Sequence, residues 1–313
     1  MQNTDVKTKS KAKSKAKRIL ISFLCVLLVV TSAFISFGGS LGIPSWNDVF
    51  AYFGVYADLG DDFSASFVDV ATADACCIRC HDKSILIDSG TSISYDKLSS
   101  YLKRNNFKSF DAVIISHLDS DHFGGLIKLL YDFEVKEIYM PKVADELIPE
   151  TEEYGMFLNS VKENKVEVKY PTIQSDVTIG DMSLNFISPV RQYDNRNDNS
   201  LVVKITYKET SFLFTGDISE KVEEDLVNSN IELKADVLKV AHHGSKTSSS
   251  EDFLKAVSPQ ISVVSVGTSD DTLPDYETMV RINHYSDSLY RTDKDKTIII
   301  TSNGNKLKIQ TNA

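Results

Sequence analysis

Apolar residues along the chain form two kinds of pattern. Short runs rich in β-branched residues predict strands, and apolar residues spaced three or four apart predict helices. Strands are expected near 63–70, 75–80, 83–87, 111–115, 135–140, 165–169, 183–187, 200–206, 211–215, 236–240, 260–266 and 296–301. Helices are expected near 95–105, 122–131, 150–163, 218–228, 250–257 and 274–286. This mixture of hairpins and strand–helix units predicts an α/β domain with mixed sheets.

One apolar stretch is much longer than a strand. Residues 19–37 carry no charge and follow a basic tail, residues 1–18, which has seven Lys or Arg against one Asp. A stretch of about 20 apolar residues matches the hydrocarbon thickness of a bilayer, whereas the core of a cleaved signal is usually about 7–15 residues long. An uncleaved transmembrane anchor is therefore favoured over a cleaved signal. Because Lys and Arg stay on the cytoplasmic side, the tail is expected inside the cell and the rest outside.

Four segments follow from these patterns. They are a basic cytoplasmic tail (1–18), a single transmembrane anchor (19–37), an aromatic-rich connector (38–62) and one folded domain (63–313). Residues 19–313 carry 27 Lys or Arg against 43 Asp or Glu, a net charge of −16. Proteins that grip several phosphates of a nucleic acid usually present a basic surface, so this charge weighs against extensive nucleic-acid binding.

One loop contains four potential metal-binding residues within six positions. Residues 116–125 read SHLDSDHFGG directly after an apolar run and contain His117, Asp119, Asp121 and His122. These four cannot line one helix face, but a tight loop that leaves a buried strand can direct all of them inward. Imidazole and carboxylate ligands suit zinc, manganese or iron, and such a set can hold two ions about 3.5–4 Å apart, as in many hydrolases. The alternative is a polar loop whose side chains are solvated or paired with one another.

Three other expected strands end in polar groups of the same kind. Asp88 follows one strand, Gly216 and Asp217 follow another, and His242 and His243 follow a third. Singly, each could be an ordinary turn. Together they predict a site at one edge of the sheets, where strand ends deliver side chains from distant parts of the sequence.

Three cysteines, Cys76, Cys77 and Cys80, lie in the domain, and residues 77–81 read CIRCH, which formally matches a c-type haem attachment motif. In a strand, Cys76 and Cys80 share one face and Cys77 takes the other, which is poor geometry for holding a porphyrin edge. The sequence leaves open whether these cysteines form a disulfide or stay as buried thiols.

In their order along the chain, these motifs resemble the metallo-β-lactamase superfamily and, more narrowly, the hydrolase domain of the ComEC-type competence proteins. The matching segments are FVDV (67–70) with Asp74, ILIDSG (85–90), HLDSDHFGG (117–125), NDNSLV (197–202), FTGD (214–217), VLKVAHHGS (237–245) and RTD (291–293). The resemblance covers roughly residues 63–301. It implies an αββα sandwich of two mixed sheets with helices outside and two metals in a groove along one edge.

The resemblance also assigns roles at the metals. His117 and Asp119 would bind the first ion, and Asp121 and His122 would bind the second. Asp217 would bridge the two ions.

One residue of the pair formed by His242 and His243 would complete the coordination or contact the substrate, with His243 favoured as the inner one. Asp121 and His243 are the expected catalytic residues, in addition to their role as ligands.

Three departures from the family pattern stand out. A histidine of the middle segment is replaced by Asn199 or Asp198, which are weaker ligands. A glycine-rich turn is replaced by residues 71–73, which read ATA. A late Gly-His-Pro element is replaced by residues 272–274, which read TLP, so Leu273 stands where a histidine would be and the second ion would lose a donor.

The sequence therefore predicts a membrane-anchored, extracytoplasmic hydrolase with two divalent ions, zinc or manganese. A metal-bound hydroxide would attack a phosphodiester or nucleic-acid-derived substrate. The hard oxygen ligand Asp119 favours manganese and phosphoesters, and Ser245 or Lys246 could steady a phosphate oxygen. The alternatives are a lactone, amide or thioester hydrolase on the same scaffold, and a lapsed enzyme that binds a partner, for which Leu273 is the main support.

Overall fold

A computed structural model describes residues 21–22, 24–32, 62–268 and 272–311. The described chain divides into two units, the helical residues 21–22 and 24–32 and the folded unit from residue 62 onward. The predicted tail lies outside the described residues, as does the predicted connector apart from residue 62, and the predicted anchor is described only in part. No helix within the described ranges combines the length and apolar character needed to cross a membrane.

The folded unit is built on two large mixed sheets. The first sheet has the spatial order β17 (Leu307–Thr311), β16 (Ile298–Ser302), β1 (Phe63–Phe67), β2 (Cys76–Cys80), β3 (Lys83–Ile87), β5 (Ala112–Ile114), β7 (Glu137–Tyr139) and β8 (Glu167–Lys169). The second has the order β15 (Ser288–Arg291), β14 (Ile261–Val264), β13 (Val237–Lys239), β12 (Thr210–Phe214), β11 (Val202–Tyr207), β10 (Met182–Ser188) and β9 (Ser175–Ile179). A short third pair joins β4 (Ser109–Phe110) to β6 (Glu134–Val135).

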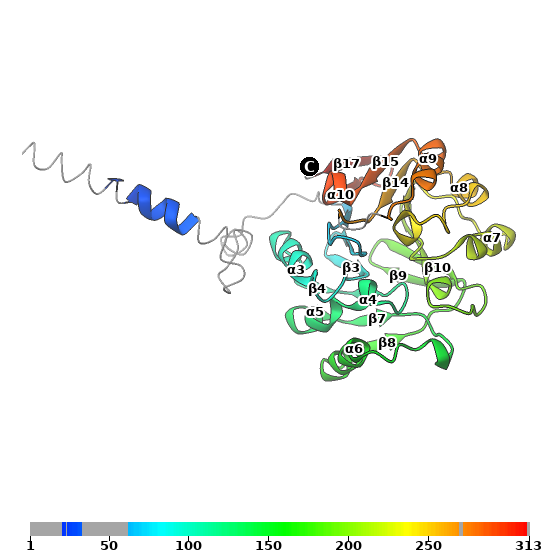
Figure 1. Cartoon of the computed structure of the whole chain (residues 1–313), viewed down its shortest axis with the longest axis horizontal. Helices are drawn as coiled ribbons and strands as arrows, with labels where there is room; N and C mark the ends of the chain where they lie inside the picture. Colours follow the sequence, from blue (N-terminus) through cyan, green and yellow to red (C-terminus); the bar gives the residue numbers. More distant parts are fainter. Residues whose placement is uncertain (1–20, 23, 33–61, 269–271, 312–313) are drawn as a thin grey trace, which may run out of the picture. The chain divides into compact units, whose positions relative to one another are not determined.

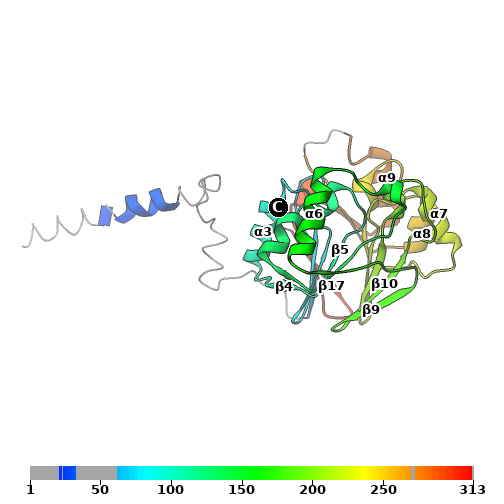
Figure 2. The same ribbon diagram turned by 90° about the horizontal axis from the view of Figure 1, so that it is seen from below.

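Helices cover the outer face of each sheet (Figures 1 and 2). The first sheet carries α3 (Tyr95–Arg104), α4 (Ser120–Phe123), α5 (Leu126–Asp132) and α6 (Glu152–Glu163). The second carries α7 (Glu220–Asn228), α8 (Glu251–Val257) and α9 (Tyr276–Tyr285), and α10 (Thr292–Asp295) follows β15. The layers are therefore helix, sheet, sheet and helix, which confirms the predicted αββα sandwich.

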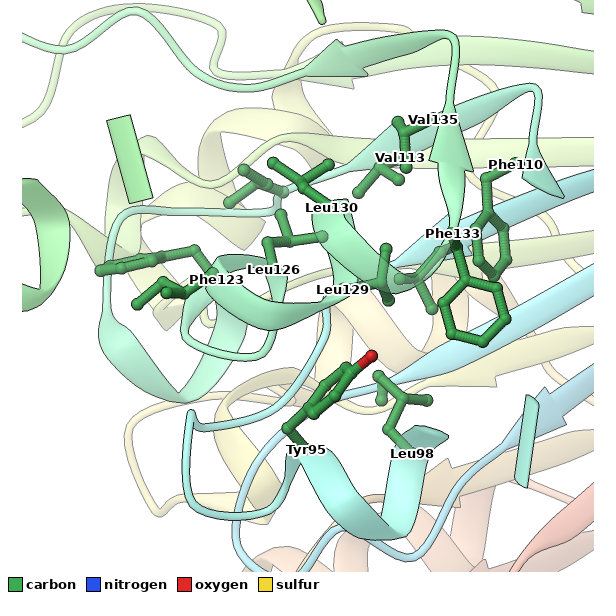
Figure 3. Close-up of a cluster of buried hydrophobic side chains, with 14 of the residues drawn as sticks. Tyr95, Leu98, Phe110, Val113, Phe123, Leu126, Leu129, Leu130, Phe133 and Val135 are labelled. Carbon is green, nitrogen blue, oxygen red and sulfur yellow. The ribbon is translucent and has the colours of Figure 1, made fainter. Parts of the chain in front are cut away.

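Three apolar cores hold these layers together. One lies between the first sheet and its helices, where Leu98 of α3 faces Leu126 and Leu129 of α5 (Figure 3). Another lies between the two sheets, and the third lies between the second sheet and its helices. Strands of each large sheet contribute alternate side chains to two of these cores, because successive residues of a strand point to opposite faces of the sheet.

The cysteines of β2 follow this alternation. Cys76 and Cys80 point into the core between the sheets, and Cys77 points into the core under the helices. All three are buried free thiols, and no disulfide joins them in the described chain. Burial raises the pKa of Cys80 to about 11, which keeps this thiol protonated at neutral pH.

Several elements differ from the sequence expectation. The expected helix over 122–131 is two helices, α4 and α5, separated by Gly124 and Gly125. A side chain at Gly125 would lie 2.1 Å from the backbone oxygen of Ser89, so the chain must approach closely at this point. The strands β9, β15 and β17 were not expected, because each has only four or five residues and at least half of these are polar.

Both sheets contain parallel strands that deliver loops to the site. In the first sheet β3, β5, β7 and β8 are parallel neighbours. In the second sheet β12, β13, β14 and β15 are parallel neighbours. The carboxyl ends of parallel strands lie at the same edge of a sheet, which is where ligands bind in many α/β folds.

The core between the sheets should dominate stability. Phe212 is fully buried there, with its ring centroid 4.9 Å from that of Phe63. We expect Phe212→Ala to lower the free energy of unfolding by about 3–5 kcal/mol in urea denaturation, because it removes apolar contacts and leaves a cavity. The control Val227→Ala, on a partly exposed position of α7, should cost less than about 1 kcal/mol. A Phe212→Ala cost as small as that of the control would contradict this assignment of the core.

Candidate metal centre

The predicted site residues follow four strands, two neighbouring strands in each large sheet. Asp88 follows β3, and His117 to His122 follow β5. Asp217 follows β12, and the pair His242 and His243 follows β13. These side chains, far apart in the sequence, meet at one edge of the two sheets.

A single carboxylate oxygen lies at the centre of the cluster. Asp217 Oδ2 lies 3.9 Å from His117 Nε2 and 3.6 Å from His122 Nε2. It also lies 3.9 Å from His242 Nε2 and 3.8 Å from His243 Nε2. These distances are too long for hydrogen bonds. They are close to the separation of about 3.3–3.6 Å expected between two ligands that share one ion tetrahedrally at about 2.0–2.2 Å.

Two groups of candidate ligands surround this carboxylate. In the first group, His117 Nε2 lies 3.5 Å from Asp119 Oδ2. In the second, Asp121 Oδ2 lies 3.5 Å from His122 Nε2 and 3.4 Å from His243 Nε2. His242 is the outermost histidine, with 32% of its side chain exposed against 3% for His243.

The cluster contains buried polar atoms that the described protein does not satisfy. The Nε2 atoms of His117, His122 and His243 and the Oδ1 atom of Asp217 have no hydrogen-bond partner there. Each such atom would cost about 1–3 kcal/mol if it were left unmatched. Imidazole nitrogens and carboxylate oxygens directed at one another suit divalent cations, and His117, His122 and Asp217, as well as Asp121, His122 and His243, are close enough to share an ion.

The other ring nitrogens are held by a second layer of contacts. His122 Nδ1 lies 2.9 Å from Asp88 Oδ2, and His243 Nδ1 donates to the Ser265 carbonyl at 2.8 Å. His117 Nδ1 lies 3.1 Å from the hydroxyl of Ser116. Because the Nδ1 atoms are engaged, each ring presents Nε2 to the cluster, as metal-binding histidines commonly do.

The backbone at this edge adopts conformations that are rare for side-chain-bearing residues. Asp88, His242 and His243 have φ values of 54°, 50° and 53°. Gly216 has φ 53°, and a methyl group there would lie 2.8 Å from Ser200 Cβ and 2.9 Å from Ser116 Cβ. Left-handed conformations of non-glycine residues cost free energy and cluster at functional sites. The close approach at Gly216 brings Asp217 against the end of the other sheet.

Opposite charges at the site shift the pKa values of its members. Burial alone would raise the pKa of Asp217, but His122 and His243 outweigh burial and hold it well below its usual value. Burial alone would lower the pKa of His122, but Asp217 and Asp121 outweigh it and hold this pKa well above its usual value. The pKa of His243 is raised in the same way. Without metal, these two imidazoles therefore bind protons more tightly than a free imidazole does.

One family model, for the metallo-beta-lactamase superfamily, matches residues 78–268, more than half of the chain. The chain belongs to the metallo-beta-lactamase superfamily. Members of this superfamily are generally metallohydrolases that use divalent ions, typically zinc or iron. The sequence-based recognition of the family is thus confirmed.

Curated relatives include competence proteins, which also confirms the narrower resemblance. ComE operon protein 3 of Bacillus subtilis (strain 168) is 27% identical over 270 residues, which cover 78% of this chain and 34% of that protein. Recombination protein 2 of Haemophilus influenzae is 28% identical over 252 residues, covering 78% of this chain and 29% of that protein. Competence protein ComA of Neisseria gonorrhoeae is 27% identical over 222 residues, which cover 69% of this chain and 29% of that protein. The chain spans about a third of the length of these relatives.

Solved structures share the fold. The metallo-beta-lactamase fold protein YhfI of Bacillus subtilis has a TM-score of 0.52 and 14% identity, covering 76% of this chain and 98% of YhfI. CmlA, a diiron β-hydroxylase of Streptomyces venezuelae, has a TM-score of 0.53 and 12% identity, covering 85% of this chain and 59% of CmlA. At these identities the likeness concerns the fold alone.

Asn199 and Asp198, which stand where the family resemblance predicts a histidine, make their hydrogen bonds outside the cluster. The side chain of Asn199 is bonded to the backbone of Tyr193 and Asn195. Asp198 accepts hydrogen bonds from the Ser219 amide and the Asn195 side chain. The structure therefore does not bring either side chain to the cluster.

Two further replacements have structural consequences. Leu273 packs against the core beneath α7, α8 and α9. Ala71, in the turn where the family resemblance predicts glycine, adopts a φ of 69°, a left-handed conformation that glycine adopts more readily.

Several residues around the site were not predicted as site residues. Arg196 donates to the outer oxygen of Asp119, and Ser116 contacts both Asp88 and His122. Lys239, buried at the end of β13, pairs with Asp74. The sequence does contain a signal for this pair, because Lys239 is the one charged residue in the apolar run of residues 237–241. A lysine on the inward face of a buried strand needs a buried partner of opposite charge.

Metal uptake should release protons. Because His122 and His243 have raised pKa values in the metal-free protein, each must lose its proton before its nitrogen can bind an ion. The apparent metal affinity should therefore rise as pH rises from 6 to 8. Calorimetric titration with zinc in two buffers of different ionisation enthalpy measures the released protons. An affinity independent of pH, with no proton release, would contradict this description of the site.

Proposed function

We propose that this protein is a membrane-anchored, extracytoplasmic hydrolase that uses two divalent ions, zinc or manganese, to cleave a phosphodiester or nucleic-acid-derived substrate. The observation that carries the proposal is the convergence of imidazole Nε2 atoms on Asp217 Oδ2, in two groups, with buried polar atoms left unmatched. A paired cluster of this kind is suited to two ions rather than one.

The proposal divides the ligands between the two groups. His117 and Asp119 would hold one ion, and Asp121, His122 and His243 the other. Asp217 would contact both, as the residue nearest to each group.

Bound divalent ions lower the pKa of water and neutralise charge that develops on a phosphoryl or acyl group. The protein's own part is to orient the ligands through Asp88, Ser116 and Ser265 and to exclude water from the buried side. His242, more exposed than His243, is placed at the outer side of the cluster, where a substrate would arrive.

Two features favour an anionic, phosphoryl-bearing substrate. Asp119 is a hard oxygen ligand, which favours manganese and phosphoester chemistry. Arg196 is bonded to Asp119 at the exposed side of the site, and a guanidinium there can bind a phosphate through two parallel hydrogen bonds. Lys246, exposed two residues beyond Gly244, could add a further positive charge.

The membrane location rests on the sequence. Residues 19–37 are uncharged and adjoin a basic tail, and the described residues 21–22 and 24–32 within them are helical. The positive tail would stay in the cytoplasm and place the hydrolase domain outside.

A lactone, amide or thioester substrate is the second candidate. The charge of −16 over residues 19–313 favours it, since an acidic protein repels long nucleic acids. A lapsed enzyme is the third candidate, because Leu273 packs into a core and offers no ligand atom. A panel of phosphodiester, lactone and thioester substrates, offered to the zinc- and manganese-loaded protein, separates the three candidate functions. We expect phosphodiester cleavage, at a rate that falls steeply as the salt concentration rises.

Asp217 is the most informative residue to change. We expect Asp217→Ala to abolish both metal retention and turnover, because this carboxylate adjoins both groups of ligands. Elemental analysis after gel filtration and a turnover assay measure the two effects. Asp181→Ala, at an exposed carboxylate paired with His81, is the control and should keep both properties. Full activity in the Asp217→Ala protein would refute the proposal.

Arg196 tests the substrate class. If it binds a phosphate, Arg196→Met should reduce kcat/KM for a phosphodiester by about 10- to 100-fold, the loss of one or two charged hydrogen bonds. The same change should leave the turnover of an uncharged lactone within about threefold of the wild-type rate, because this substrate has no phosphate for Arg196 to bind. A threefold change corresponds to about 0.6 kcal/mol in the activation free energy. An equal loss on both substrates would show that Arg196 acts through Asp119 rather than on the phosphate.

A further inference from the structure

A buried ion pair lies behind the candidate metal centre. Lys239 is the last residue of β13, and it points into the space between the sheets, as Val237 does two residues earlier. Its Nζ lies 2.8 Å from Asp74 Oδ2 and donates to the Val240 carbonyl at 2.9 Å. The two side chains are only 5% and 6% exposed, and they come from segments that belong to different sheets.

Asp74 links this pair to two proposed ligands. Its Oδ1 atom lies 3.6 Å from His243 Nδ1, on the side of the ring where the Ser265 carbonyl accepts a hydrogen bond. Its backbone amide donates to the Asp121 carbonyl at 3.3 Å. Asp74 thus contacts both segments that bring Asp121 and His243 together.

The other group of ligands has different supports. His117 is held by Ser116, and Asp119 is held by Arg196. Among the described residues, no hydrogen bond or ion pair joins Asp74 or Lys239 to His117 or Asp119. The ion pair therefore supports one side of the cluster.

Stability alone gives little reason for this arrangement. Burying a lysine and an aspartate costs several kcal/mol per ion, and apolar residues of similar volume often give equal or greater stability. A charged pair in an otherwise apolar core is better explained by the side chains that it orients.

We propose that Lys239 and Asp74 are positioning residues that serve one of the two ions, the one assigned to Asp121, His122 and His243. Lys239 holds Asp74 Oδ2 in place. Asp74 Oδ1 makes no hydrogen bond, but its negative charge 3.6 Å from His243 Nδ1 favours the proton that Nδ1 donates to the Ser265 carbonyl. His243 therefore presents Nε2 to the ion, while the backbone of Asp74 holds the Asp121 loop. This inference rests on the proposed binding of two ions.

Zinc titration in competition with a chromophoric chelator tests the proposal, with the stoichiometry and affinity of each site as readout. The wild-type protein should bind two equivalents. Lys239→Met and the double variant Asp74→Asn/Lys239→Met should bind one equivalent with wild-type affinity and the second about 10- to 100-fold more weakly, the range typical of lost outer contacts at metal sites.

The double variant separates positioning from simple charge neutralisation. Lys239→Met alone leaves Asp74 buried without its cation, which could unfold the protein, whereas the double variant contains no unpaired charge and is close in volume to the wild type. Circular dichroism confirms folding before each titration. Lys204→Met is the matched control, since Lys204 lies on β11 of the same sheet with its Nζ bonded to the Glu232 carbonyl, and it should bind zinc as the wild type does.

The outcomes are distinct. If both sites of the double variant bind zinc with wild-type affinity, the proposal is overturned, because Lys239 and Asp74 would then only neutralise each other's charge. Equal weakening of both equivalents would also overturn it, because the support would not be selective. A wild-type protein that binds no zinc or manganese would instead overturn the proposed function on which the inference rests.

Discussion

The candidate site depends on a concentration of buried charge at one edge of the sandwich. Asp217 lies within 3.6–3.9 Å of four imidazole nitrogens, and its own Oδ1 atom has no partner among the described residues. Carboxylates and imidazoles are buried together at a net gain only when cations or protons balance them. In the metal-free protein, the raised pKa values of His122 and His243 act in this direction, because they favour protons on these imidazoles beside the carboxylates. Divalent ions would supply it more completely, because they also engage the unmatched atoms.

The fold makes this concentration of charge possible. The αββα layers bury three apolar cores, and these cores hold the strand ends rigidly while the polar loops stay at the rim. Gly216 allows the two sheets to approach closely enough for Asp217 to face ligands from the other sheet. The left-handed backbone at Asp88, His242 and His243 is tolerated because the packed strands on either side fix it. The ion pair of Lys239 and Asp74 adds a polar connection between the sheets directly behind the site.

Much of this arrangement could be predicted from sequence, since strand ends and ligand types are local features. The loop of residues 116–125 and the strand-end positions of Asp217 and His243 follow from apolar runs that stop at polar residues. Contacts between distant segments could not be predicted in this way. The pairing of Arg196 with Asp119 and the use of Asn199 in its own loop depend on the path of residues 189–201, where apolar periodicity is weak. The short strands β9, β15 and β17 were missed for the same reason, because tertiary pairing decides them more than pattern does.

The central claim is that two cations bind around Asp217. Crystallography of the manganese-loaded protein, with anomalous scattering at the manganese edge, tests it most directly. We expect two anomalous peaks about 3.5–4 Å apart, one beside His117 and Asp119 and the other beside Asp121 and His243, with Asp217 between them. Peaks elsewhere on the molecule, or the absence of any peak at this edge in the loaded protein, would show that the cluster does not bind two ions.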